Sequence, residues 1–160
     1  MTELNKKALS YALTLLGRKR YAKNQLEQKL RNRGFPEEDV KAVILYCEER
    51  NYLNDGEFAR FWIEDRIRFK PMGRRRLRSE LLQQGIREEI INQVLDELLP
   101  EEQELLLAKN AVRAKLTKLQ SQGVNQYKLF NFLLRRGFSP EIIRRSIYEL
   151  GIDFSEVNQT

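Results

Sequence analysis

One pattern of residues occurs three times in this chain, and it constrains the fold more than any other feature. A leucine, three residues, a second leucine, three residues, a glycine and an apolar residue stand at 26–35, 77–86 and 129–138. The glycines, Gly34, Gly85 and Gly137, are 51 and then 52 residues apart. Self-similarity at such a period is typical of an array of supersecondary units. Arrays of this kind present long surfaces to other macromolecules more readily than they form a catalytic pocket.

Each copy of the pattern predicts a helix that ends at its glycine and a second helix that follows. A glycine after an apolar i, i+4 pair suits the position where the backbone turns left-handed beyond a helix. Arg135 and Arg136 precede Gly137 in the last turn, where cations complement the helix dipole. The following helix begins with proline or acidic residues, most clearly at Ser139 and Pro140.

A longer helix precedes each copy, over roughly residues 3–18, 55–69 and 101–119, with apolar residues at helical spacing. Asn54 is expected to cap the second of these helices. No stretch alternates apolar and polar residues with period two, so no strand is predicted.

The sequence therefore predicts an all-α protein, a tandem array of three three-helix units with about nine helices, elongated and curved. We place the units at residues 1–53, 54–99 and 100–152, followed by a polar tail at 153–160. Turns within the units are expected at 21–22, 71–73 and 121–123. A unit of about 50 residues is marginally stable alone, so we expect neighbouring units to pack against each other.

Composition excludes several kinds of site. The chain has no histidine and one cysteine, which excludes Ser-His-Asp systems, zinc sites built from these residues and an internal disulfide. Cys47 aligns with Leu98 and Leu150 of the other copies and is expected in the core. We expect no cofactor, no metal and no catalytic residue. The chain has no membrane-length apolar run and no signal-peptide core, so we expect a cytoplasmic protein that does not bind membranes.

Charge favours an anionic partner. Lysine and arginine number 29 against 23 acidic residues, which gives a formal charge of +6. The densest basic run places seven basic residues and no acidic one in positions 66–78. Its members are Arg66, Arg68, Lys70, Arg74, Arg75, Arg76 and Arg78.

Four of these arginines fall in the first turns of a helix that begins near Gly73. Cations there oppose the helix dipole, at a cost of about 0.3–1 kcal/mol each. A plain solvated surface is the alternative, but such an arrangement is not one that stability would favour. We therefore predict that the run contacts either a phosphate backbone or an acidic protein surface, which charge alone does not separate.

A secondary basic surface consists of Arg18, Lys19, Arg20 and Lys23. Its first three members lie at the end of the first helix, where positive charge is stabilising, so a structural role accounts for them. Trp62, in the most aromatic stretch of the chain, is interpreted as a core residue. The alternative is an exposed Trp62 on which bases stack.

The same residues carry a resemblance to a known family. Residues 53–60, Asp65, Arg66, Gly73, 76–81 and 85–86 are similar to the central signature of the RecX family, bacterial regulators of the RecA recombinase. Residues 18–30 with 34–35 resemble the family's opening motif. Ala22 and Gln25 stand where that motif usually has serine and glutamate, so a weaker cap on the second helix is expected.

The resemblance implies a regulator without catalytic activity of its own. It implies that the protein lies in the groove of the RecA filament on single-stranded DNA and inhibits strand exchange and ATP hydrolysis, or promotes disassembly, in recombination, DNA repair and the SOS response. We expect a monomer that binds duplex DNA weakly at most. Two alternatives remain, a duplex-DNA binder built from helix-turn-helix-like units and an enzyme that uses carboxylates and a metal.

Overall fold

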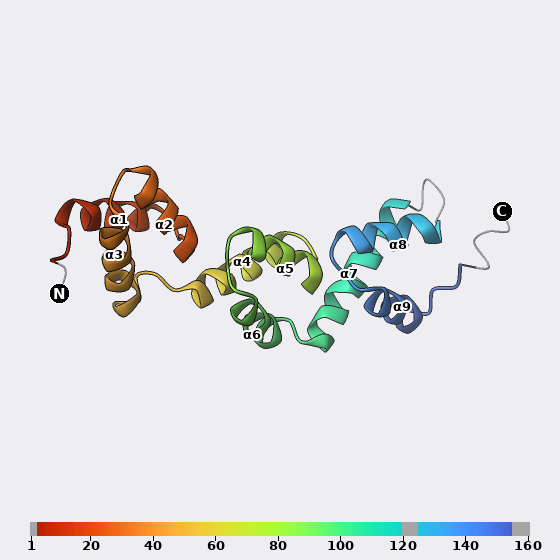
Figure 1. Cartoon of the computed structure of the whole chain (residues 1–160). Coiled ribbons are helices and arrows are strands. Elements are labelled where there is room, and N and C mark those ends of the chain that lie inside the picture. Colours follow the sequence, from red (N-terminus) through yellow and green to blue (C-terminus); the bar gives the residue numbers. More distant parts are fainter. Residues whose placement is uncertain (1–2, 120–124, 155–160) are drawn as a thin grey trace.

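The structure is a computed structural model that describes residues 3–119 and 125–154. All regular structure in these ranges is helical. The elements are α1 (Lys6–Arg18), α2 (Lys23–Asn32), α3 (Glu37–Glu49), α4 (Asp55–Phe69), α5 (Arg74–Gln83), α6 (Glu88–Leu98), α7 (Glu101–Leu119), α8 (Gln126–Arg135) and α9 (Pro140–Glu149). Figure 1 shows that these helices lie in successive groups along an elongated molecule. The predicted all-α array of three-helix units is confirmed.

The bounds of the long helices agree with the sequence pattern. α4 and α7 begin and end where predicted, and α1 begins three residues later, at Lys6. Asn54 Oδ1 accepts a hydrogen bond from Glu57 N at 3.0 Å, which confirms the predicted cap. Ser139 Oγ accepts one from Ile142 N at 3.2 Å. The turn predicted at 121–123 lies outside the described residues.

The glycines of the repeated pattern end α2, α5 and α8 as predicted. Gly34, Gly85 and Gly137 have φ angles of 96°, 84° and 91°. In each turn the amide of the next residue donates to the carbonyl of the pattern's second leucine, five residues earlier, as Phe138 N does to Leu133 O at 3.2 Å. This is the Schellman arrangement, which satisfies carbonyls that the helix end would leave without partners.

Three buried clusters form the core, one in each group of helices. The first contains the fully buried Cys47, as predicted, and burial raises the pKa of its thiol. The clusters are not separate, because Ala22 at the start of α2 belongs to the middle cluster. Leu107 of α7 packs against both the middle and the third cluster. The unit boundaries at 53/54 and 99/100 stay predictions.

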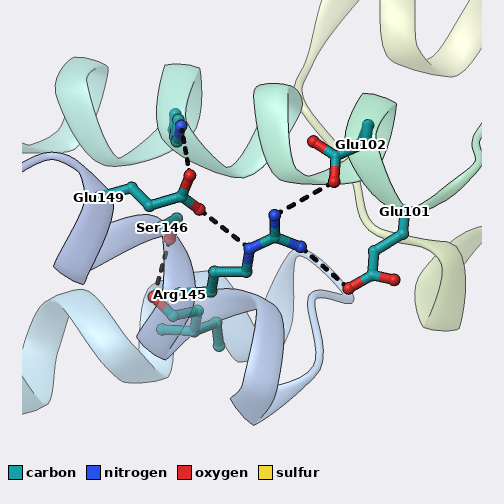
Figure 2. A network of polar contacts seen from close by, with 7 residues as sticks. Glu101, Glu102, Arg145, Ser146 and Glu149 are labelled. Atoms are coloured by element: carbon teal, nitrogen blue, oxygen red, sulfur yellow. Dashed lines mark hydrogen bonds and ion pairs between the residues drawn. The ribbon is translucent and has the colours of Figure 1, made fainter.

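An ion-pair network fastens α9 to α7 (Figure 2). Arg145 contacts Glu101 at 3.0 Å, Glu102 at 3.1 Å and Glu149 at 3.0 Å, and Lys109 reaches the same Glu149 at 3.5 Å. Exposed pairs contribute little singly, but several charges joined in one network contribute more. Of the tail predicted at 153–160, Phe154 packs half-buried on the third cluster, and residues 155–160 lie outside the described ranges.

Candidate functional site

The start of α5 meets the end of α8, and this contact joins the middle group of helices to the third. Three donors of α5 reach the last carbonyls of α8: Gly73 N to Arg136 O at 2.8 Å, Arg75 N to Gly137 O at 3.1 Å and Arg76 Nη1 to Arg135 O at 3.2 Å. A Cβ atom built on Gly73 would overlap the Gly137 carbonyl. The positive end of α5 therefore faces the negative end of α8.

This contact changes the interpretation of the arginines that begin α5. They lie in the first turns of α5, as the sequence predicted. The end of α8 covers this N-terminus, however, and its carbonyls offset the dipole there. Helical periodicity gives no sign of the contact, since it joins residues about 60 positions apart in the chain, such as Arg76 and Arg135.

Each junction between helix groups also contains a carboxylate that caps a helix of the preceding group. Asp55 Oδ1 accepts from Lys23 N, the first residue of α2, at 2.8 Å. Glu104 Oε2 accepts from Arg74 N, the first residue of α5, at 2.6 Å. Carboxylates next to a helix N-terminus satisfy free amides and interact favourably with the dipole. The following unit thus supplies the cap.

The residue before α2 is Ala22, which the sequence predicted would leave a weaker cap. The Ala22 side chain provides no cap, as expected, but two other side chains bind the amides at this helix start. Besides the Asp55 contact, Gln25 Oε1 accepts from Ala22 N at 3.1 Å. Ala22 itself is fully buried in the middle cluster. A small residue at this position therefore serves the packing between units.

Burial raises the pKa of Glu104 above its ordinary value, although the hydrogen bond from Arg74 N lowers it. A raised folded-state pKa means that the folded chain holds this proton more tightly than the unfolded chain. The contribution of Glu104 to the free energy of unfolding therefore increases as pH falls through the folded-state pKa, and it levels off below the ordinary pKa.

We expect Glu104→Ala to lower the free energy of unfolding at pH 7 by about 1–2 kcal/mol, because it removes the cap on α5. Glu104→Gln retains an acceptor and should cost less. Urea unfolding checks both variants at pH 7 and near pH 4.5, the ordinary pKa of this group. Relative to the wild type, the loss of unfolding free energy in Glu104→Gln should be larger at the lower pH. A smaller loss at the lower pH would contradict a raised pKa of Glu104.

Among the seven basic residues of the predicted site, Arg74 is held by polar contacts to two other helices. Its Nη2 contacts Asp96 at 2.6 Å, and its Nη1 donates to the carbonyl of Leu99 at 3.2 Å. Together with the amide contact to Glu104, these bonds fix the start of α5 to α6 and α7. The side chain of Arg74 is therefore part of the junction.

Arg66 and Arg76 share one carboxylate, Glu80, at 3.1 and 3.5 Å. Trp62 Nε1 also donates to Glu80, at 2.8 Å. The Trp62 ring is half-buried, stacks on Phe58 and carries the Arg66 guanidinium at 5.0 Å from its centroid. These contacts favour the interpretation of Trp62 as a core residue.

The other four members of the run make fewer polar contacts within the described residues. Arg78 pairs with Glu88. Arg68, Lys70 and Arg75 are exposed, and none of them has an ion-pair partner in the described ranges. These three cations are therefore the members of the run that are free to meet a ligand.

The secondary basic residues lie at or near the junction of the first and middle groups. The Arg20 guanidinium lies 3.4 Å from the centroid of the Phe61 ring, and Lys19 Nζ lies 4.7 Å from that of Tyr21. Lys23 Nζ pairs with Glu48 at 3.2 Å, and Arg18 is the last residue of α1. These contacts agree with the structural role that the sequence favoured.

Sequence reasoning did not include Arg135 and Arg136 in the site. The structure places them beside Arg75 and Arg76, at the junction of α5 and α8. One signal was available. The corresponding positions of the middle copy are Gln83 and Gln84, so a last-turn cation is not a requirement of the repeated pattern.

Two further searches bear on the class of protein. Over residues 3–119 and 125–154 no helix has the length and apolarity needed to cross a bilayer. Within the same residues, no three acidic or cysteine side chains converge as a metal site requires.

Known proteins are similar to this chain over most of its length. The family model for the first three-helix domain of RecX matches residues 8–47, and that for the second matches 54–95. A Regulatory protein RecX of Prosthecochloris aestuarii is 34% identical over 146 residues, 91% of this chain and 94% of the relative. Another, of Vibrio parahaemolyticus, is 35% identical over 130 residues, 80% of this chain and 81% of the relative.

The fold agrees with that of a solved structure. The crystal structure of RecX from Lactobacillus salivarius matches with a TM-score of 0.83 at 24% identity, over 91% of this chain and 95% of that one. At this identity the likeness shows the fold, and the curated relatives, at 34% and 35%, show the family. The chain, with its three-helix units in tandem, belongs to the RecX family.

Proposed function

We propose that this chain is a regulatory protein that binds the filament formed by RecA recombinase on single-stranded DNA and lowers its activity. The observation that carries the proposal is similarity to proteins named regulatory protein RecX along 91% of the chain. The role in recombination and the SOS response follows from the same membership. The protein acts through contact, and no catalytic residue is assigned.

The shape of the molecule supports this proposal. Three groups of helices in a row give a long surface, suited to contact several repeating subunits at once (Figure 1). The carboxylates of Asp55 and Glu104 and the α5–α8 hydrogen bonds hold neighbouring groups together. The exposed Arg68 and Lys70 add positive charge without internal partners in the described ranges.

The test is the ATPase rate of RecA on single-stranded DNA while this protein is titrated in. We expect the rate to fall and the protein to co-sediment with the filaments. An unchanged ATPase rate together with no co-sedimentation would contradict the proposal. Tight binding to duplex DNA in the absence of RecA, falling steeply with salt, would instead favour the duplex-binding alternative.

We expect the double variant Arg68→Glu, Lys70→Glu to weaken filament binding at least about tenfold, because two favourable charges become unfavourable ones. A matched control is Lys6→Glu, Lys7→Glu, which reverses two exposed charges at the start of α1. Co-sedimentation at several protein concentrations measures both. Equal weakening in the two variants would show that only net charge matters, and that Arg68 and Lys70 make no specific contact.

A further inference from the structure

The two junctions between helix groups bring together the same four positions of the repeated pattern, but the side chains at these positions differ. Counting from the leucines of the repeated pattern, the junction of the first and middle groups has an amide quartet, Asn24, Gln25, Gln83 and Gln84. The corresponding positions between the middle and third groups form an arginine quartet, Arg75, Arg76, Arg135 and Arg136. The chain thus has four neutral side chains at these positions of one junction and four positive ones at the other.

The amide quartet shows that the contact does not need positive charge. Gln25 Nε2 donates to Gln84 Oε1 across the junction. The Asn24 side chain lies against Gly85, where a Cβ atom would overlap it. Neutral side chains therefore occupy these four positions at one junction of the same molecule.

The arginine quartet brings like charges together. Burial and the nearby Arg76 charge both lower the pKa of Arg136. In the described residues, the carboxylate that pairs with the quartet is Glu80, at 3.5 Å from Arg76, and Arg66 shares it. The dipole of α8 favours Arg76, whose Nη1 donates to Arg135 O at 3.2 Å, but the amides of Gly73 and Arg75 already take the next two carbonyls, those of Arg136 and Gly137.

An aromatic side chain lies beside the quartet. The Arg136 guanidinium is 5.1 Å from the centroid of the half-buried Phe132 ring, and Lys115 Nζ is 4.6 Å from the same centroid. Lys115 comes from α7, so three helices supply the cations of this surface. Cations from several elements around an aromatic ring are typical of grooves that follow a single nucleic-acid strand.

We infer that the arginine quartet is a binding site for the phosphodiester backbone of single-stranded nucleic acid. The inference rests on the proposed function, for which it names the DNA strand of the filament as a direct contact. Guanidinium groups match phosphate oxygens in bidentate geometry and stay charged at all relevant pH values. A nucleic-acid strand also presents negative charges at regular, close spacing, one for each nucleotide, which suits four clustered cations.

The amide quartet supplies the decisive variant. Arg75→Asn, Arg76→Gln, Arg135→Gln and Arg136→Gln together copy the other junction, which folds with these residues. A matched control removes four charges elsewhere through Lys6→Gln, Lys7→Gln, Lys29→Gln and Lys41→Gln, all exposed. A third variant with lysine at the four quartet positions keeps the charge but loses the planar fork. Circular dichroism and small-angle scattering check the fold of all three.

The measurement is the fluorescence anisotropy of a labelled oligothymidylate, without RecA, from 50 to 200 mM salt. Each phosphate contact contributes about 0.7 to the slope of log affinity against log salt for single strands. We expect the quartet variant to lose about 2–3 units of slope and at least about tenfold in affinity at 50 mM salt. The control with the four Lys→Gln substitutions should lose less than about twofold in affinity. The variant with lysine at the four quartet positions should bind with an affinity between those of the wild type and the quartet variant.

Equal losses of affinity in the quartet variant and in the Lys→Gln control would overturn the inference. A wild-type protein that does not bind the oligonucleotide would overturn it as well. Stronger competition by duplex of equal length would overturn the assignment to single strands. The ATPase assay with the same variants separates this inference from the proposed function. A wild type that binds oligothymidylate but leaves RecA unaffected supports the inference and defeats the proposed function. A quartet variant with full oligonucleotide affinity defeats the inference alone.

Discussion

Replacing Gly73 with alanine is expected to separate α5 from α8 and to lower the free energy of unfolding by about 1–3 kcal/mol. Gly73 has φ −88° and ψ 167°, which alanine adopts without strain. The cost comes from its new Cβ atom, which would overlap the carbonyl of Gly137. Urea unfolding measures the loss, and the distance between spin labels on α4 and α9 reports the displacement.

Two comparisons isolate the cause. Gly17→Ala in α1 meets no atom within 4 Å and should raise the free energy of unfolding by up to about 1 kcal/mol, since alanine favours a helix. Ala22 occupies the corresponding position of the first unit and is tolerated there. A Gly73→Ala variant that unfolds like the wild type, with unchanged label distances, would contradict the close approach of α5 and α8.

The helices of this fold could be predicted because their signals are local. A left-handed glycine leaves its signature within about ten residues, and the three copies reinforced one another at Gly34, Gly85 and Gly137. The same holds for the caps at Asn54 and Ser139, which lie next to the amides that they bind. Periodicity and capping therefore sufficed for the order and bounds of the helices.

The junctions could not be predicted in the same way, because they join residues about 30 to 60 positions apart. Asp55 and Glu104 look like ordinary first-turn acids of their own helices in the sequence. A weaker signal was present at the residues that precede α2 and α5. Ala22 and Gly73 lack a capping side chain, whereas Asn125 before α8 caps its own helix. Small residues there indicate that another chain segment approaches.

The candidate site shows the same limit. The run at 66–78 is continuous in sequence, but the fold assigns Arg74 to the junction and leaves Arg68, Lys70 and Arg75 exposed. Arg135 and Arg136 join Arg75 and Arg76 only through the α5–α8 contact. Charge density along the sequence therefore located the right helix but not the full set of cations.

The second large effect is expected from Phe138→Ala, which should lower the stability of the third unit by about 3–5 kcal/mol. Phe138 is fully buried in the third cluster, and its truncation leaves a cavity between α7, α8 and α9. In a linear array each unit is stabilised by its immediate neighbours, so the loss should stay mostly in the third unit. Hydrogen exchange should show fast amides over 101–150 and protected amides over 8–47.

Phe35→Ala is the matched control for this prediction, because it removes the same side chain at the same position of the first copy. Phe35 is only half-buried and lies against Tyr11 at a ring-centroid distance of 6.3 Å. A Cβ atom at Gly34 would meet no atom within 4 Å, whereas one at Gly137 would overlap Arg76 of α5. Phe35→Ala should therefore lower stability less than Phe138→Ala does, and the loss should fall on the first unit.

If Phe138→Ala made the amides of 8–47 exchange as fast as those of 101–150, the array would unfold as one cooperative body. The carboxylates of Asp55 and Glu104, which cap helices of the preceding units, would then couple the units more strongly than packing between neighbours alone allows.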